Sequence, residues 1–142
     1  MNPILAIDFG HARIGTAISD GLQLLAHPLE TIAANRRPIS RITEIVRERK
    51  VDHVVVGIPR QLSGKIGTAA SQTLGFIEKL RAILPCPVVT WDERLTTVAA
   101  HRALRETGKK MRMKILRYIA AAKNPDRRGQ KRIERFRPTR CR

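Results

Sequence analysis

The sequence predicts an α/β fold: one mixed sheet, flanked by helices, in which an antiparallel three-strand meander is followed by parallel strands. Three β-type segments come before any stretch of helical periodicity. Helical and β-type segments then alternate, which is typical of parallel strands joined by crossover helices. The chain has 142 residues, of which 42% are hydrophobic, enough for one substantial core but not for two. We therefore expect one domain, over residues 1–123.

The first part of the chain is expected to form the meander. Residues 4–7 are an apolar run, and residues 13–19 alternate between two kinds of side chain, so a tight connection between them predicts a hairpin. Asp20-Gly21 is a turn signal, and residues 27–32 can form a third strand. The sheet should therefore begin with three antiparallel strands.

Helices and parallel strands are expected to follow. Pro38 suits the first turn of a helix that runs to Lys50 with its apolar residues on one face. Residues 53–58 contain three consecutive valines, which is typical of a strand buried on both faces. The other predicted elements are a helix over 68–84, a strand over 88–91, a helix over 96–106 and a last helix over 111–122.

The charge is concentrated near the C-terminus. Residues 109–142 contain 14 Lys and Arg against two acidic residues, which accounts for +12 of the formal net charge of +16. This excess predicts a nucleic-acid partner, because cations that neutralise phosphates release condensed counterions. Residues 124–142 contain few large apolar side chains, so we expect a basic, disordered tail there.

Other classes of protein are disfavoured. No apolar run approaches eighteen residues, and the N-terminal residues do not have the layout of a signal peptide, so we expect a cytoplasmic protein with no membrane partner. Cys86 and Cys141 each lack a second Cys or a His at metal-ligand spacing, and we expect two free thiols.

Acidic residues follow two of the predicted strands. Asp8 comes after residues 4–7, and Asp92 and Glu93 come after residues 88–91. The carboxyl ends of strands in an open α/β sheet border the usual ligand crevice, so these carboxylates are expected to converge. Such a group suits a hard divalent cation, Mg²⁺ or Mn²⁺. Because adjacent strand residues point to opposite faces, only one of Asp92 and Glu93 should reach the metal.

Three motifs occur in order along the chain: Leu5-Ala6-Ile7-Asp8-Phe9-Gly10 with Arg13-Ile14-Gly15, then Val55-Val56-Gly57-Ile58-Pro59, then Trp91-Asp92-Glu93-Arg94-Leu95-Thr96-Thr97. They resemble the signature blocks of the pre-16S rRNA nuclease family, also described as Holliday-junction-resolvase-like. The resemblance covers residues 4–112 and implies a ribonuclease H-like fold. It also implies a bacterial, cytoplasmic, magnesium-dependent endonuclease in 5′-end maturation of 16S rRNA, acting on a structured rRNA precursor or ribosomal particle.

Phosphodiester hydrolysis requires an activated water and stabilisation of negative charge, and carboxylate-bound divalent ions supply both. We expect Asp8 to be a bridging metal ligand and Glu93 the second catalytic ligand, with Asp92 a further ligand or a support. The candidate nucleic-acid-binding residues are Arg13, Arg60, Lys65, Arg94, Lys109, Lys110 and Arg112.

Some of these residues have simpler explanations. Arg94 could pair with Asp92, and Arg60 and Lys65 could be ordinary solvated loop cations. Gly10 and Gly15 could permit tight turns, or they could let a phosphate or metal approach the backbone. These alternatives remain open at the level of sequence.

One position departs from the family pattern. Family members place a third acidic residue at the start of the last helix, where this chain has Arg117. A guanidinium cannot ligate Mg²⁺, so two functions remain: a nuclease that uses Asp8 and Glu93, with impaired activity, or a non-catalytic RNA- or ribosome-binding relative. A third class, an actin-like or sugar-kinase-type nucleotide binder, requires two such domains and this chain has one.

Overall fold

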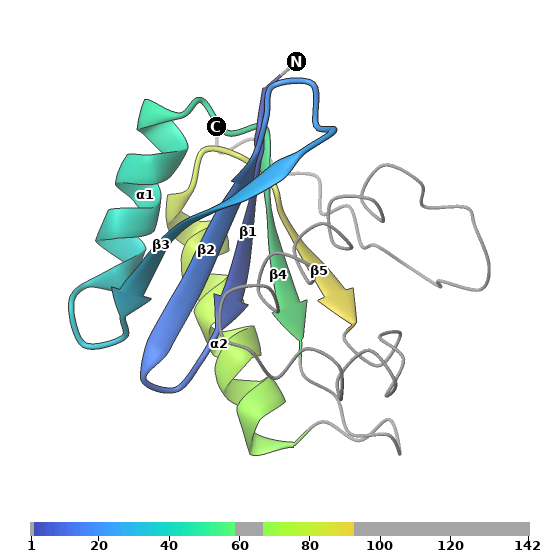
Figure 1. Ribbon diagram of the computed structural model, residues 1–142. Coiled ribbons are helices and arrows are strands. Elements are labelled where there is room, and N and C mark those ends of the chain that lie inside the picture. The colour runs from blue at the N-terminus through green and yellow to red at the C-terminus, as the bar shows by residue number, and fades with distance from the viewer. Residues whose placement is uncertain (1, 59–66, 93–142) are drawn as a thin grey trace, which may run out of the picture.

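The computed structural model describes residues 2–58 and 67–92, which form five strands and two helices (Figure 1). In chain order these are β1 (Ile4–Phe9), β2 (Arg13–Ser19), β3 (Ala26–Ala33), α1 (Pro38–Glu48), β4 (His53–Ile58), α2 (Thr68–Ile83) and β5 (Val88–Asp92). The strands make one sheet in the order β3-β2-β1-β4-β5. The mixed α/β fold is confirmed, as is each predicted element up to residue 92.

The meander occupies one half of the sheet. β1 pairs antiparallel with β2, from Leu5 opposite Ile18 to Phe9 opposite Ile14, and β2 pairs antiparallel with β3. The second ladder shifts register between Gly15 and Ala17. At this bulge the Thr16 hydroxyl donates to the carbonyl of Glu30 at 2.7 Å and accepts from its N–H at 3.2 Å, which replaces lost ladder bonds.

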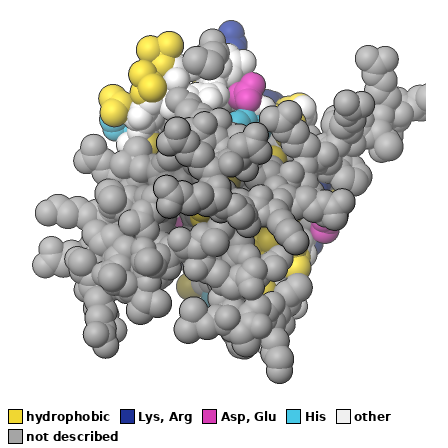
Figure 2. Space-filling model, turned by 90° about the vertical axis from the view of Figure 1, so that its right-hand side faces the viewer, with side chains coloured by type: hydrophobic (Ala, Val, Ile, Leu, Met, Phe, Trp, Pro, Cys, Tyr) yellow, Lys and Arg dark blue, Asp and Glu magenta, His cyan; other side chains and the backbone are white. Residues whose placement is uncertain are grey.

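The turn between β2 and β3 is held by Asp20, as the turn signal predicts. Its carboxylate accepts hydrogen bonds from the N–H groups of Leu24 at 2.7 Å and Leu25 at 3.0 Å. The turn leaves Leu22, Leu24 and Leu25 exposed. Figure 2 shows hydrophobic side chains gathered at the top of the molecule, the end at which this turn lies.

The other half of the sheet is parallel. β1 pairs with β4 from Ile4 opposite His53 to Ile7 opposite Val56, and β4 pairs with β5. Val54, Val55 and Val56 are at most 2% exposed, which confirms a central strand buried on both faces.

Both helices pack on the same face of the sheet (Figure 1). Pro38 occupies the first turn of α1, as predicted, after Arg37 in a left-handed conformation with φ of 46°. The helix ends before Lys50, whose φ is 51°, and the N–H of Val51 closes it by donating to the carbonyl of Val46 at 3.1 Å.

An ion pair fastens α1 to β3. The Arg41 guanidinium donates to the Glu30 carboxylate, with Nη2 2.8 Å from Oε1, and also to Glu44 at 2.9 Å. The hydrogen bond from Arg41 holds the pKa of Glu30 below its usual range.

Side chains of β1 alternate between two buried clusters. Leu5 and Ile7 face the helices and pack with residues of α1, α2 and β4. Ile4 and Ala6 face the other way and pack with Val55 and other residues of β2 to β5. The predicted helices over 96–106 and 111–122 and the tail over 124–142 lie outside the described residues.

Candidate functional site

Asp8 lies at the carboxyl end of β1, opposite Gly15 of β2. Strand alternation gives it the face of Ile4 and Ala6, away from the helices, whereas Phe9 packs on the helix side. The residue is partly buried, so a solvent-borne ligand can reach it. The strand tip thus presents a carboxylate to one face of the sheet and an aromatic ring to the other.

Glycines lie on both sides of Asp8. Gly15 pairs with it on β2, and because Ile7 pairs with Val56, Gly57 follows at the same level on β4. Trp91 of β5 pairs with Gly57 and completes the row. Neither of the two residues that flank Asp8 directly, Gly15 on β2 and Gly57 on β4, carries a side chain on that face.

The carboxyl ends of β1 and β5 lie at the same end of the sheet, since both strands run parallel to β4. One strand separates them, so their backbones are about 10 Å apart at the usual interstrand spacing. Asp92 is the last residue of β5 and pairs with Ile58. Glu93 lies outside the described residues, and the predicted convergence of its carboxylate with Asp8 remains a prediction.

A basic corner formed by Arg13, Arg36 and Arg37 lies at the same end of the sheet as Asp8. The N–H of Ala34 donates to the carbonyl of Ala12 at 3.0 Å, which joins the β1–β2 turn to the β3–α1 loop. This bond brings Arg13 of β2 to the same end of the sheet as Arg36 and Arg37, and all three are exposed. Exposed guanidinium groups at the end of the sheet that also carries a carboxylate are suited to phosphate binding.

Arg36 and Arg37 are absent from the set of binding residues that the sequence suggests. The available signal is the Asn35-Arg36-Arg37-Pro38 run directly before a predicted helix, at the end of a strand. The remaining predicted binding residues, namely Arg60, Lys65, Arg94, Lys109, Lys110 and Arg112, lie outside the described residues, as does Arg117.

Other titratable groups offer little chemistry. Across residues 2–58 and 67–92, His, Cys, Asp and Glu do not gather in any group of three or more that could hold a metal. Cys86 is a free thiol, and burial raises its pKa, so it is poorly suited to act as a nucleophile.

The profile of a family described as "Holliday junction resolvase" matches residues 2–123. The chain belongs to this family. Many members are named "Putative pre-16S rRNA nuclease". One from Desulforudis audaxviator is 38% identical over 122 residues, covering 83% of this chain and 86% of the relative. Another, from Acetivibrio thermocellus, is 44% identical over 118 residues, covering 80% of this chain and 84% of the relative. The family assignment confirms the resemblance seen in the three motifs.

Among solved structures, "T. thermophilus RuvC in complex with Holliday junction substrate" is similar in fold. The TM-score is 0.57 at 15% identity, and the match covers 86% of this chain and 93% of that one. The ribonuclease H-like fold is thereby confirmed. Neither α1 nor α2, the two helices of the described part of the chain, combines the length and apolar character that crossing a membrane requires.

Proposed function

We propose that this chain is a metal-dependent endonuclease that hydrolyses phosphodiester bonds of a structured rRNA precursor, during 5′-end maturation of 16S rRNA in the bacterial cytoplasm. The observation that carries the proposal is Asp8: a carboxylate at the carboxyl end of a central strand, between two glycines and at the same end of the sheet as three exposed arginines. The names of the relatives support the choice of substrate.

The residues present fit a divalent ion. Asp8 and Glu93 would hold Mg²⁺ or Mn²⁺, and the ion supplies an activated water and stabilises negative charge on the phosphate. Val89 and Trp91 share the face of Asp8. Strand alternation predicts the same face for Glu93, two residues after Trp91 in the sequence. We therefore assign the second ligand to Glu93 and a supporting role to Asp92.

The cations have a separate task in this scheme. Arg13, Arg36 and Arg37 bind phosphates that flank the scissile bond and hold the strand across the carboxyl edge of the sheet. Arg60, Lys65, Arg94, Lys109, Lys110 and Arg112, together with the tail over 124–142, would extend this contact along the backbone of the RNA.

Arg117 supports a second candidate function, a non-catalytic RNA- or ribosome-binding relative. A cation at the position of the family's third carboxylate removes one metal ligand and repels the ion. Binding through the basic surface does not depend on that ligand. The two functions therefore differ in catalysis and not in affinity for RNA.

The decisive experiment is Mg²⁺-dependent cleavage of a structured rRNA precursor by the wild type, Asp8→Asn and Arg117→Asp. As a nuclease, the wild type cleaves, and Asp8→Asn lowers the rate by at least about 100-fold, because a bound metal contributes several kcal/mol and each 1.4 kcal/mol is tenfold. Asp52→Asn is the matched control, since this exposed carboxylate precedes β4 at the opposite end of the sheet.

The other outcomes are equally clear. If Arg117 impairs the site, Arg117→Asp increases the rate. Inactivity of all variants, with RNA binding retained, refutes the nuclease and supports the binding role. Cleavage of a four-way DNA junction but not of the RNA would refute the assignment of substrate.

A further inference from the structure

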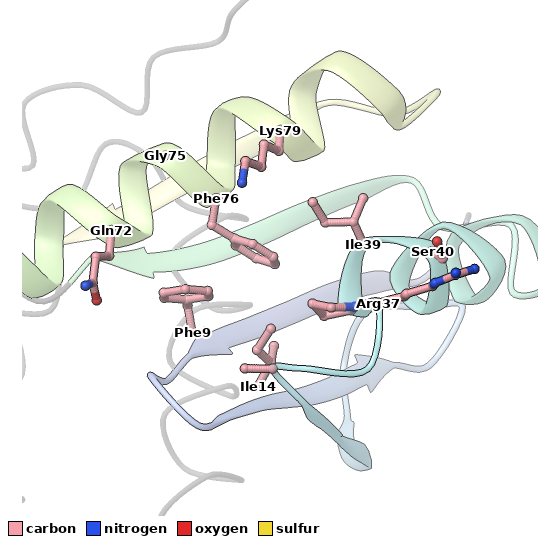
Figure 3. Close-up of a pocket in the computed structure, with 11 residues that line it drawn as sticks. Phe9, Ile14, Arg37, Ile39, Ser40, Gln72, Gly75, Phe76 and Lys79 are labelled. Carbon is pink, nitrogen blue, oxygen red and sulfur yellow. The ribbon is translucent and has the colours of Figure 1, made fainter.

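A pocket of about 470 Å³ opens at the same end of the sheet as Asp8, but on the helix side. It lies between the tip of β1, the start of α1 and the middle of α2 (Figure 3). Pockets of about 300–1,000 Å³ are the usual size for small ligands. This one is not needed for the metal chemistry assigned to Asp8.

Aromatic and aliphatic side chains form its inner wall. The rings of Phe9 and Phe76 stack with their centroids 4.6 Å apart and their planes at 29°. Ile14 and Ile39 lie beside this aromatic pair (Figure 3). Phe76 is 7% exposed and Ile14 is fully buried, so the partly exposed ring of Phe9 is the one on which a flat group such as a nucleobase can stack.

Gly75 also lines the pocket, at the eighth position of the 16-residue helix α2. Glycine in the interior of a helix costs about 1 kcal/mol relative to alanine. A Cβ atom at this position would meet no heavy atom within 4 Å, so packing within the protein does not require glycine. The space over Gly75 is instead available to a ligand.

The charged residues that line the pocket, Arg37 and Lys79, are both cations. Lys79 follows Phe76 by one turn of α2, and Arg37 directs its guanidinium outward, away from the aromatic pair (Figure 3). An apolar wall with cations at its border is complementary to a base joined to phosphate.

The position of the pocket relates it to the proposed catalytic site. Phe9 directly follows Asp8, and the two residues face opposite sides of the same strand tip. A single strand of RNA that crosses this edge of the sheet can reach both faces. Building on the proposed function, we propose that the pocket holds an unpaired base of the RNA strand, a few nucleotides from the phosphate at Asp8.

The test fills the pocket without disturbing the fold. Gly75→Leu places a side chain in it, while Gly75→Ala adds one methyl group and Ala82→Leu adds the same leucine at an exposed position of α2 that does not line it. The probe is a fluorescein-labelled single-stranded RNA octamer containing 5-iodouridine, in EDTA and at constant salt. Anisotropy measures Kd, and photo-crosslinking followed by peptide mapping locates the base.

We expect Gly75→Leu to raise Kd at least about fivefold, which is the lower range for loss of one stacked base. It should also abolish a crosslink to the peptides containing Phe9 or Phe76, whereas both controls keep the crosslink and bind as the wild type does. Unchanged Kd and crosslinking in Gly75→Leu would overturn the proposal. Thermal unfolding of each variant is measured in parallel. If Gly75→Leu lowers the midpoint temperature, its loss of RNA binding counts as support only if circular dichroism shows the native fold at the assay temperature.

Free AMP separates the two possible sources of a nucleotide. Displacement of the octamer by AMP at equal concentration would overturn the assignment to an RNA strand and indicate a site for free nucleotide. The assay contains no metal and measures no cleavage. If the wild type does not cleave RNA but Gly75→Leu still weakens RNA binding, the nuclease proposal is refuted and the base-binding pocket is supported. If the wild type cleaves RNA but Gly75→Leu leaves binding unchanged, the pocket proposal is refuted and the nuclease proposal stands.

Discussion

The same substitution, glycine to alanine, is expected to have opposite effects at Gly10 and Gly75. Gly10 lies in the β1–β2 turn, and a Cβ atom there would approach the backbone carbonyl of Arg13 to under 3.0 Å. Backbone cannot rotate aside as a side chain can, so the turn must shift. At Gly75 the added methyl enters open space.

The magnitudes follow from these environments. Forcing an extra carbon into a filled site costs about 1–3 kcal/mol, so Gly10→Ala should lower the free energy of unfolding by that amount. Gly75→Ala should raise it by about 1 kcal/mol, the difference in helix propensity. The two variants are therefore expected to differ by roughly 2–4 kcal/mol, the sum of these effects.

Urea denaturation followed by circular dichroism measures both values with the wild type as reference. Equal slopes against urea are required, because a changed slope reports a changed native or denatured state rather than a changed contact. A Gly10→Ala protein as stable as the wild type would refute the steric reasoning. Because the turn begins two residues after Asp8, this variant should also cleave RNA more slowly if Asp8 is catalytic.

Three further predictions concern charge. Glu30→Gln should lower the midpoint temperature slightly at pH 7, and this difference should shrink as the pH falls, because the pairing that lowers the pKa of Glu30 stabilises the fold above the ordinary carboxylate pKa and is lost as pH falls through the lowered value; a difference that does not change with pH would contradict this. Deleting residues 124–142 removes eight Lys and Arg and should make the slope of log affinity against log salt shallower by up to about 6 for single-stranded RNA; an unchanged slope would exclude the tail as a contact. In a Cys141→Ser background, Cys86 should be alkylated several-fold more slowly at pH 7 in the folded protein than in urea, because burial raises its pKa; equal rates would show an accessible thiolate.

The elements up to residue 92 could be predicted from sequence because their signals are local. Three valines in succession indicate a central parallel strand, and Pro38 before an apolar stripe indicates the start of a helix. Asp8 could be placed at a strand tip for the same reason. The observed boundaries differ from the predicted ones by one residue at each end of β3, by one residue at the end of α2, and by two residues at the end of α1, which stops at Glu48 rather than Lys50.

Features that depend on contacts between distant segments could not be predicted in this way. Phe9 and Phe76 belong to elements far apart in the chain, and only the packing of α2 over β1 brings their rings together. Arg13 is brought to the end of the sheet that carries Arg36 and Arg37 by the pairing of Arg13 with Ala33 and by the hydrogen bond from Ala34 to Ala12. No periodicity or composition signal encodes either contact, so the pocket and the basic corner emerge only from the tertiary structure.

The irregular pairing of β3 affects how copies of this chain behave when they crowd together. β3 is an edge strand, and a regular free edge is a template on which another chain can add a strand and start aggregation. Pro28 has no N–H to offer to a new neighbour, and the bulge at Gly15 and Ala17 interrupts the ladder beside it. A protein of net charge +16 becomes concentrated along any polyanion that it binds. The β3 edge of the sheet is therefore protected against strand addition when copies of the chain are brought close together.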